Sequence, residues 1–374
     1  MTSSVVISGS GLWKPNHSIS NEELVDAYNA HAEQFNHQHQ KAIEQGELKS
    51  KPLSSAEFIE KASGIKSRYV YMKEGVLDID RMRPNIPERT DDELSDQAEM
   101  AIHAAKDALK AANKKSEDID VVIVACAYTQ RSYPALAIEV QGALGIKGFA
   151  FDMLVACSAA TFALHRAYEM IAASTAKAVL VINPELTSPQ VNYCDRDSHF
   201  IFGDVSTAMV VESAVTANSE HVFEIMSTKA VTQYSNNIRS NFGYVSRAND
   251  VDPFAEDKLF HQEGRKVFKD VCPMAVEHIF EHLTRHELRS ENVSRWWLHQ
   301  ANINMNTLIS RKLLGKQPTL EVAPIVLDTF ANTASAGSII AFCLYHKDLQ
   351  LGDIGLLCSF GAGYSIGSLI LKKR

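Results

Sequence analysis

The chain has 374 residues, which is enough for one large domain or two of medium size. Its net charge is −8, and 45% of its residues are apolar against 22% charged, as in soluble globular proteins. An acidic chain of this kind is not expected to bind nucleic acid without sequence preference, because such binding needs a surplus of basic residues.

Targeting signals and cysteine patterns are also absent from the sequence. No apolar run approaches the roughly 18 residues of a membrane-spanning helix. The amino-terminal MTSSVVISGSGLW lacks the basic and long apolar segments of a secretory signal. The six cysteines are scattered without a CxxC pair, so neither a disulfide scaffold nor a cysteine zinc site is expected. We therefore expect a reduced, cytoplasmic protein that does not associate with a membrane.

Short β-branched runs alternate with longer helical stretches, which is typical of layered α/β proteins. The polar stretch 29–55 is predicted to be helical and is interpreted as a solvated surface insertion, with a lid over a substrate entrance as the alternative. Further along, apolar residues recur at steps of three and four and predict one face of a helix: Leu94, Ala98, Ala101, Ala105, Ala108 and Ala112. In chain order, the predicted strands are residues 5–9, 119–125, 150–155, 178–183, 208–212, 222–227, 295–299, 355–359 and 365–371.

The chain reads as two similar halves, residues 1–215 and 216–374, joined by a polar segment near residues 213–221. In each half a helix leads through an acidic turn into a buried strand. The segment SEDIDVVIVACA of the first half corresponds in this way to SENVSRWWLHQA of the second. We expect each half to form its own layered unit.

Several motifs fail on inspection. Gly9 and Gly11 follow a predicted strand, but the third glycine of a dinucleotide fingerprint is missing and no helix follows. The run from Gly363 to Gly367 spells a hydrolase nucleophile elbow, yet no acid or histidine comes after it. Three histidines at helical spacing are interpreted as part of a solvated helix face rather than a metal site: His278, His282 and His286.

Three residues in loops after predicted strands can carry chemistry. Cys157 lies between a predicted buried strand, 149–156, and a predicted helix, 158–173, where the positive end of the helix dipole favours the thiolate. His299 ends the apolar WWLH strand, and Asn332 lies in a tight loop before a helix predicted to begin around Ala334. Each residue singly also fits a structural role, as an inert cysteine, a core histidine and a turn residue.

Together these segments resemble the thiolase-like condensing enzymes, and most closely the β-ketoacyl-acyl-carrier-protein synthase III group. The resemblance covers nearly the whole chain and rests on VACSAATF, FGDVSTAMVVE, GRKVFK, LHQAN, ANTASAGS and SFGAGYSIGS, in this order. It implies the thiolase-like α/β fold, with two similar βαβαβαββ halves packed as α-β-α-β-α layers. A true thiolase is disfavoured, because Cys358 does not match that group's second cysteine.

The resemblance implies a role for each matched residue. Cys157 is the acyl-accepting nucleophile, and its backbone amide forms an oxyanion hole with that of Ala362. His299 and Asn332 donate hydrogen bonds to the thioester of the extender unit as carbon dioxide leaves. Aromatic residues line the acyl tunnel, and one of them, Tyr133, reaches it from the partner subunit of a homodimer; the others are Phe202, Phe268 and Phe360.

Departures from the family pattern concern the entrance and the primer. The Trp and Arg that clamp the adenine of CoA in acetyl-CoA-using members are matched by Phe58 and Ala62, and a basic residue after HQAN is replaced by Asn304. The insertion 29–55 makes this a long-form sequence, similar to synthases that take medium-chain primers. A basic patch for the acidic carrier protein is retained at Lys269, Arg311 and Lys312.

The expected function is a decarboxylating Claisen condensation in fatty acid biosynthesis. It joins an acyl primer, expected to be a medium-chain acyl-CoA, to malonyl-acyl-carrier protein, without a metal or other cofactor. Two alternatives remain: an acyltransferase or ketide synthase of secondary metabolism on the same scaffold, and a non-catalytic partner subunit. The last of these is disfavoured, because Cys157, His299 and Asn332 are all present.

Overall fold

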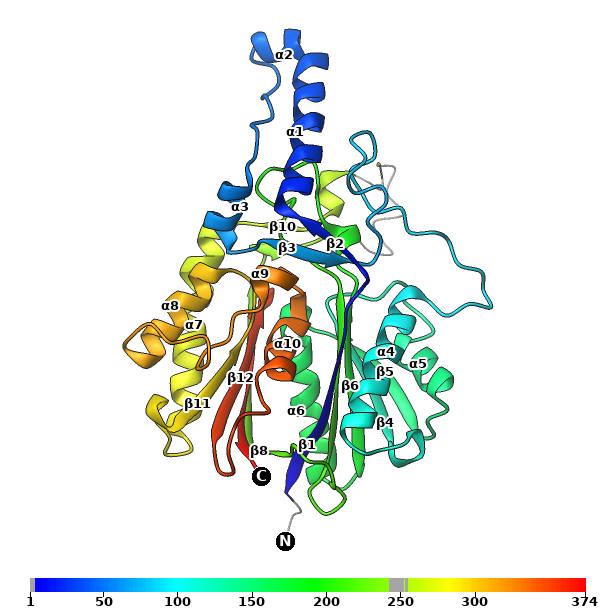
Figure 1. Ribbon diagram of the computed structural model, residues 1–374, viewed down its shortest axis with the longest axis vertical. Helices are drawn as coiled ribbons and strands as arrows, with labels where there is room; N and C mark the ends of the chain where they lie inside the picture. Colours follow the sequence, from blue (N-terminus) through cyan, green and yellow to red (C-terminus); the bar gives the residue numbers. More distant parts are fainter. Residues whose placement is uncertain (1–3, 242–251, 253–254) are drawn as a thin grey trace.

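A computed structural model describes residues 4–241, 252 and 255–374 (Figure 1). Its strands are β1 (Val5–Trp13), β2 (His17–Ser20), β3 (Ser67–Val70), β4 (Val121–Cys126), β5 (Phe149–Leu154), β6 (Ala178–Glu185), β7 (Val205–Ser213), β8 (Phe223–Ser235), β9 (Ile238–Arg239), β10 (His261–Gln262), β11 (Val293–Leu298), β12 (Ile354–Gly361) and β13 (Gly363–Lys373). Its α-helices are α1 (Asn21–Gln38), α2 (Gln40–Glu44), α3 (Ala56–Ser63), α4 (Asp96–Ala111), α5 (Leu136–Leu144), α6 (Ala159–Ala172), α7 (Gly264–Thr284), α8 (Ile303–Leu314), α9 (Leu327–Phe330) and α10 (Gly337–Leu344).

Nine strands form one mixed sheet in the order β11-β12-β13-β8-β1-β7-β6-β4-β5. The order of pairing repeats from the centre outward. In one direction β1 pairs antiparallel with β7, β7 antiparallel with β6, and β6 parallel with β4. In the other direction β8, β13, β12 and β11 pair in the same sequence of orientations. The two half-sheets join where Val6 and Ile7 pair with Glu224 and Phe223.

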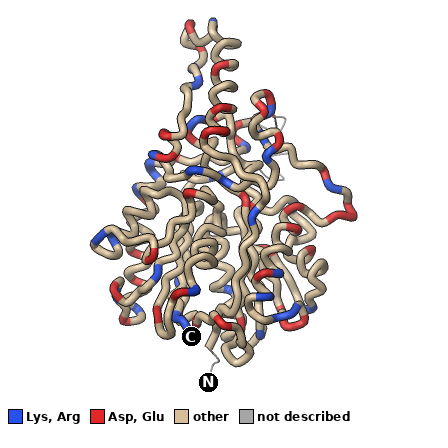
Figure 2. Tube along the Cα trace, viewed as in Figure 1, with Lys and Arg blue, Asp and Glu red and all other residues tan. Residues whose placement is uncertain are grey.

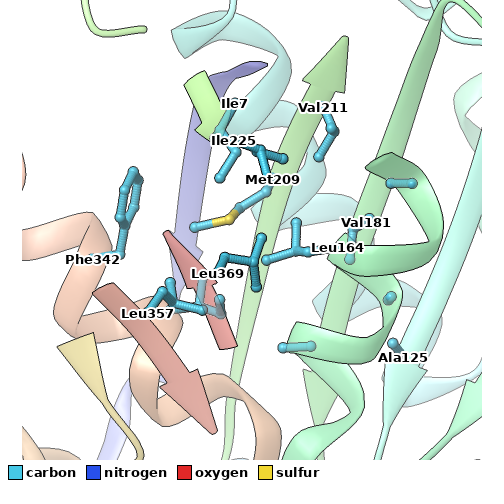
Figure 3. Packing of buried hydrophobic residues seen from close by; sticks show 14 of the residues in the cluster. Ile7, Ala125, Leu164, Val181, Met209, Val211, Ile225, Phe342, Leu357 and Leu369 are labelled. Atoms are coloured by element: carbon cyan, nitrogen blue, oxygen red, sulfur yellow. The ribbon is translucent and has the colours of Figure 1, made fainter. Parts of the chain in front are cut away.

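The two half-sheets form the two β layers of the molecule. One layer of helices lies between them and one lies on the outer face of each, which gives an α-β-α-β-α architecture. Helices α4 and α5 pack on the first half-sheet and α7 and α8 on the second, each around its own apolar cluster. Helices α6 and α10 lie between the half-sheets, and their side chains meet strands of both halves in a central core (Figure 3). Leu164 and Phe342 represent the two helices in this core, which excludes water from the centre of the molecule.

A smaller unit stands above the sheet. Strands β2 and β3 pair, and helices α1 and α3 pack with them around an apolar cluster that includes Leu24, Ile59 and Phe202. Helices α1 and α2 project away from the body at the top of Figure 1. Helix α1 begins at Asn21, before the predicted insertion, and residues 45–55 return without helix, so only the first part of 29–55 is helical.

All nine predicted strands are present and form the large sheet, with most boundaries shifted by one to four residues. The strand predicted over 222–227 runs eight residues further, to Ser235, and β2, β3, β9 and β10 were not predicted. The predicted alanine face on α4 is buried against the sheet. The prediction of a buried strand over 149–156 is wrong in part, because β5 is the edge of the sheet and its terminal residues Phe149 and Leu154 are about half exposed, at 49% and 55%. Apolar composition alone does not distinguish a buried strand from an apolar sheet edge.

The interpretation of the three histidines as a solvated face is wrong for two of them. His278 and His282 are buried on α7, and both hydrogen-bond the hydroxyl of Ser368, at 2.9 and 2.7 Å. Glu277 and Glu281, which are next to these histidines along α7, are exposed, so the boundary between the buried and the solvated face of the helix runs between them. Among the described residues, no group of three or more His, Cys, Asp or Glu side chains is placed to hold a metal ion.

Charged residues of both signs are distributed over the whole molecule (Figure 2). Acidic and basic positions are interspersed along the trace (Figure 2). Within the described ranges, none of the helices combines the length and apolar character needed to cross a bilayer.

The rejected glycine motif in β1 has a packing role. A Cβ atom on Gly9 would lie 2.4 Å from the carbonyl oxygen of Ala108, and one on Gly11 would lie 2.1 Å from that of Ala104. Real Cβ atoms do not approach so closely, so β1 and α4 touch backbone to backbone at these glycines. The glycines therefore allow the alanine face of α4 to lie flush on the sheet.

We predict that Gly11→Ala lowers the free energy of unfolding by about 1–3 kcal/mol, because the added methyl group must push α4 away from β1. The matched control is Gly142→Ala within α5, where no described atom lies within 4 Å of the new Cβ. This control should unfold at the same or a slightly higher temperature, since alanine favours helix over glycine. Thermal unfolding of both variants checks the expectation, and equal stability of the two would contradict it.

Candidate active site

Cys157 lies in a 3₁₀ turn, Ala156–Ser158, between β5 and α6. The turn is unusual, because Ala156 has φ of +44°, a conformation that residues with a Cβ atom rarely adopt. The hydroxyl of Ser158 donates to the carbonyl of Ser365 at 2.9 Å and fixes the turn to β13. The cysteine is thereby held at the amino-terminal end of α6 while its sulfur faces a cavity.

The glycine-rich turn between β12 and β13 packs directly on this cysteine. A Cβ atom on Gly361 would lie 2.5 Å from Cβ and 2.9 Å from Sγ of Cys157, so only glycine permits the contact. Backbone hydrogen bonding by Ala362 and by Cys157 itself lowers the pKa of this thiol, so both N–H groups lie close to the sulfur. An oxyanion hole needs two such donors beside the sulfur, aimed at the place that the carbonyl oxygen of a bound thioester would take.

The expectation that the helix dipole favours the thiolate at rest is not met. Burial raises the pKa of the Cys157 thiol to about 12, and the nearby carboxyl of Glu185 raises it further. The two backbone amides oppose this shift but do not overcome it. The cysteine is therefore a neutral thiol at rest, and charge develops on it only during reaction.

His299 follows the end of β11 and is buried at 2% exposure. Burial lowers the pKa of its imidazole to about 4, so the ring is neutral at physiological pH. Its backbone N–H donates to the carbonyl of Cys358, and its ring meets Phe360 edge-on at 5.1 Å. Nδ1 is buried without a hydrogen-bond partner among the described residues.

Asn332 is fixed at both backbone groups to the segment around Phe202. Its N–H donates to Ile201 at 3.0 Å, and its carbonyl accepts from Gly203 at 3.1 Å. Its side-chain Oδ1 accepts from the backbone N–H of Ala334 at 3.0 Å, which orients the amide so that Nδ2 is the free donor. The helix after it begins at Gly337, since residues 334–336 form a 3₁₀ turn.

The structure brings Cys157, His299 and Asn332 to one cavity of about 600 Å³. A second cavity of about 620 Å³ also reaches Cys157 from the side of the 127–133 loop. The four aromatic residues expected to line one tunnel are divided between the two. Phe268 and Phe360 lie with His299, Tyr133 lies in the second cavity and is 81% exposed, and Phe202 lines both.

Phe58 lines the cavity that contains His299. Its ring is in contact with a cationic side chain that the sequence analysis did not identify. The guanidinium of Arg196 stacks over its ring, 3.6 Å from the centroid. Asn302, from the HQAN segment, donates to the carbonyl of Ala62 at 2.7 Å and joins α8 to α3 beside this cavity. A cation and an aromatic ring therefore stand together where the sequence analysis found only Phe58 and Ala62.

The three residues of the predicted basic patch are exposed on two helices that pack together. Lys269 lies on α7, and Arg311 and Lys312 lie in the last turn of α8.

Glu185, at the end of β6, is a further residue of the site that the sequence analysis missed. It is fully buried and accepts from the backbone N–H of Ala127 at 3.1 Å, from the backbone N–H of Ser335 at 3.1 Å and from the Ser335 hydroxyl. Its pKa is raised to about 7 by burial. Because Ser335 belongs to the turn that follows Asn332, Glu185 ties this turn to the first half-sheet.

Solved structures with the same architecture define the class of fold. The crystal structure of 3-oxoacyl-[acyl-carrier-protein] synthase III from Aquifex aeolicus superposes with a TM-score of 0.76 at 26% identity, covering 98% of this chain and 99% of that one. Xanthomonas campestris OleA, solved with bound lauric acid and lauroyl-CoA, gives a TM-score of 0.74 at 15% identity, and each chain is covered completely. The fold is that of the thiolase-like condensing enzymes.

Sequence comparison gives the family. Models for 3-oxoacyl-[acyl-carrier-protein] synthase III and for its C-terminal region match residues 151–232 and 283–373. The beta-ketodecanoyl-[acyl-carrier-protein] synthase of Pseudomonas aeruginosa is 55% identical over 94% of this chain and 100% of its own length. The beta-ketoacyl-[acyl-carrier-protein] synthase III of Methylococcus capsulatus is 32% identical over 73% of this chain and 83% of its own. The chain belongs to the 3-oxoacyl-[acyl-carrier-protein] synthase III family, acyltransferase-type condensing enzymes of fatty acid synthesis.

We predict that the rate of Cys157 alkylation by iodoacetamide rises about tenfold per pH unit from pH 7 to pH 10 without levelling off. The raised pKa keeps the thiol protonated throughout this range, and only the thiolate reacts. Glutathione, as an ordinary thiol, should level off above pH 9. Peptide mass spectrometry isolates the reaction at Cys157, with Cys157→Ala as the blank, and a plateau below pH 8 would contradict the prediction.

Proposed function

We propose that this chain condenses a medium-chain acyl primer with malonyl-acyl-carrier protein, releasing carbon dioxide and forming a 3-oxoacyl-acyl-carrier protein. The observation that carries the proposal is the convergence of Cys157, His299 and Asn332 on one cavity, with two backbone amides close to the sulfur. A thiol with an oxyanion hole suits acyl transfer, and two neutral donors suit stabilisation of an enolate.

In the first half-reaction the sulfur of Cys157 attacks the carbonyl of the primer thioester. The carbonyl oxygen takes the negative charge of the tetrahedral intermediate and accepts from the N–H groups of Cys157 and Ala362. The thiolate of CoA then leaves and takes up the proton given up by the cysteine. The product is an acyl-enzyme, and its thioester lies in a buried cavity with limited access to water.

In the second half-reaction the malonyl thioester loses carbon dioxide, and the electron pair of the broken C–C bond forms an enolate. The enolate oxygen accepts from His299 and from Nδ2 of Asn332. The carbanion attacks the acyl carbonyl, the new C–C bond forms, and the Cys157 thiolate leaves and takes one proton from water. Decarboxylation supplies the electron pair, so the reaction as written uses no metal or other cofactor.

The two cavities provide separate places for the two substrates. The malonyl thioester must reach His299 and Asn332, so it takes the first cavity. The acyl chain bound to Cys157 must then lie elsewhere. The second cavity offers it apolar contacts with Leu154, Phe202 and Phe260. We assign the acyl chain to this second cavity, where Tyr133 stands at the exposed side.

The proposed primer is an acyl-CoA of about octanoyl length. The relative from Pseudomonas aeruginosa is named for a beta-ketodecanoyl product, and addition of two carbons to an eight-carbon primer gives a chain of that length. Each buried methylene contributes ~0.8 kcal/mol, so six more than acetyl offer up to ~5 kcal/mol. Ordering of the chain offsets part of this gain.

The proposed partners are acyl carrier protein, bound through the basic patch of Lys269, Arg311 and Lys312, and a second copy of the chain. Support for the homodimer comes from β5, an edge strand with half-exposed Phe149 and Leu154, and from Ile138 and Tyr133 exposed nearby. Unpaired apolar edges of this kind are normally covered in the native assembly. All six cysteines are free, which agrees with a cytoplasmic location.

Variants of the three site residues should separate the half-reactions. Cys157→Ala should form no acyl-enzyme. His299→Ala and Asn332→Asp should still acylate Cys157 but lose about a hundredfold or more in malonyl decarboxylation, because each removes one donor to the enolate oxygen. Asn332→Asp keeps an acceptor for the N–H of Ala334, so the turn is retained.

Intact-protein mass after incubation with octanoyl-CoA reports the first half-reaction, and release of labelled carbon dioxide reports the second. The assignment of the nucleophile would be overturned by an acyl adduct on another residue of the wild type. The assignment of the donors would be overturned by near wild-type condensation in the His299→Ala, Asn332→Asp double variant.

The dependence on primer length is a separate prediction. We expect kcat/KM to rise from acetyl-CoA through butyryl- and hexanoyl-CoA to a maximum near octanoyl-CoA, because each methylene adds buried apolar surface. It should fall once the cavity is filled. Initial rates with a series from acetyl- to decanoyl-CoA test this, and a steady decline from acetyl-CoA onward would show that the primer is short.

A further inference from the structure

The insertion 29–55 folds back on itself and is locked at two points. Asn36 donates to the carbonyl of Lys51 at 2.9 Å and accepts from its N–H at 2.8 Å. Asn29 makes the same pair of bonds with Ser54, at 3.1 and 2.8 Å. The two asparagines are seven residues apart, about two helical turns, so they lie on one face of α1. The returning limb 51–54 is therefore fixed along the helix.

This returning limb touches the segment that forms the mouth of the cavity. Nζ of Lys51 donates to the carbonyl of Cys194 at 2.8 Å. Nε of Arg196 donates to the carbonyl of Leu53 at 2.8 Å while its guanidinium stacks on Phe58. Phe58 and Asp197 line the cavity that contains Cys157 and His299. Contacts thus run without a break from α1, through the limb, to the entrance.

The remainder of the insertion is not part of this connection. Helix α2 and residues 45–50 lie beyond the Asn36 lock, at the projecting end seen in Figure 1, and no residue of α2 is buried. Gln40 bonds only Glu44 within the same helix, at 2.8 Å. The insertion thus has a base that reaches the entrance and a tip that does not.

We propose that the base of the insertion, residues 29–36 and 51–54, positions Arg196 on Phe58 and thereby sets the affinity for the nucleotide end of an acyl-CoA. The inference rests on the proposed function and extends it to the role of the insertion, which is neither a passive surface segment nor a lid. The paired guanidinium and aromatic ring offer charge to phosphate groups and a flat surface to a purine base. Loss of the bonds that hold Arg196 reduces this preorganisation without altering the reacting groups.

Two conservative variants test the base, and one tests the tip. Lys51→Met keeps the apolar stem of the side chain and removes the donor to Cys194, and Asn36→Asp removes the donor to Lys51. Each should raise KM for octanoyl-CoA by about five- to tenfold with kcat unchanged, the effect expected for one lost hydrogen bond. Octanoyl-pantetheine, which lacks the nucleotide, should keep its wild-type KM. Gln40→Glu, the matched change in the tip, should leave every constant unchanged.

The dissociation constant for free CoA, measured by calorimetry, provides a readout independent of turnover and should rise in both base variants. The proposal would be overturned by unchanged CoA affinity in these variants, or by an equal rise of KM for octanoyl-pantetheine, which would mean a general loosening of the cavity. It would also fall if the wild type did not bind CoA. The condensation proposed above fails on a different result, namely wild-type protein that binds CoA but releases no carbon dioxide from malonyl-carrier protein.

Discussion

The absence of a side chain at position 361 is the constraint on which the site depends. The turn between β12 and β13 approaches Cys157 so closely that a methyl group there would collide with the cysteine Cβ at 2.5 Å. This contact joins the carboxyl end of a strand from one half of the molecule to Cys157 of the other half. Because the turn carries the N–H of Ala362, the same approach that seals the two halves together also places an amide on the sulfur. Packing of the two halves and the nearness of this amide to the sulfur are thus consequences of one close contact.

Neutrality is the second general property of the site. The thiol has a raised pKa, the imidazole has a lowered pKa, and the remaining donor is an amide. Burial is the main cause of both shifts, because a low-dielectric environment disfavours charge. A neutral, buried site of this kind stabilises a charge that develops during a reaction only where preorganised hydrogen-bond donors are already in place. It contrasts with sites that keep a thiolate–imidazolium pair at rest.

The sequence predicted the strands of the large sheet and the alanine face of α4 because these features depend on local patterns of apolar residues. It did not predict the short strands β2, β3, β9 and β10. The relation between Glu185 and Ser335 could not be predicted, since 150 residues separate them and only the packing of the two halves brings them together. The stacking of Arg196 on Phe58 escaped prediction for the same reason. The exposure of β5 was misjudged because apolar residues at a sheet edge look the same in sequence as those in its centre. The family resemblance correctly implied that Cys157, His299 and Asn332 share one cavity. It did not predict that the aromatic residues are divided between two cavities.

The buried histidines give the fold a defined response to acid. His278 and His282 have pKa values lowered to about 4 and about 3 by burial, and His299 and His346 are lowered to about 4. In the unfolded chain such groups titrate near 6.5, so the unfolded state binds more protons at mildly acidic pH. The stability that these neutral rings confer is fully present above pH 6.5 and declines as the pH falls towards their folded values. His299 belongs to this set, so the proton that would disable its imidazole is also one that favours the unfolded chain.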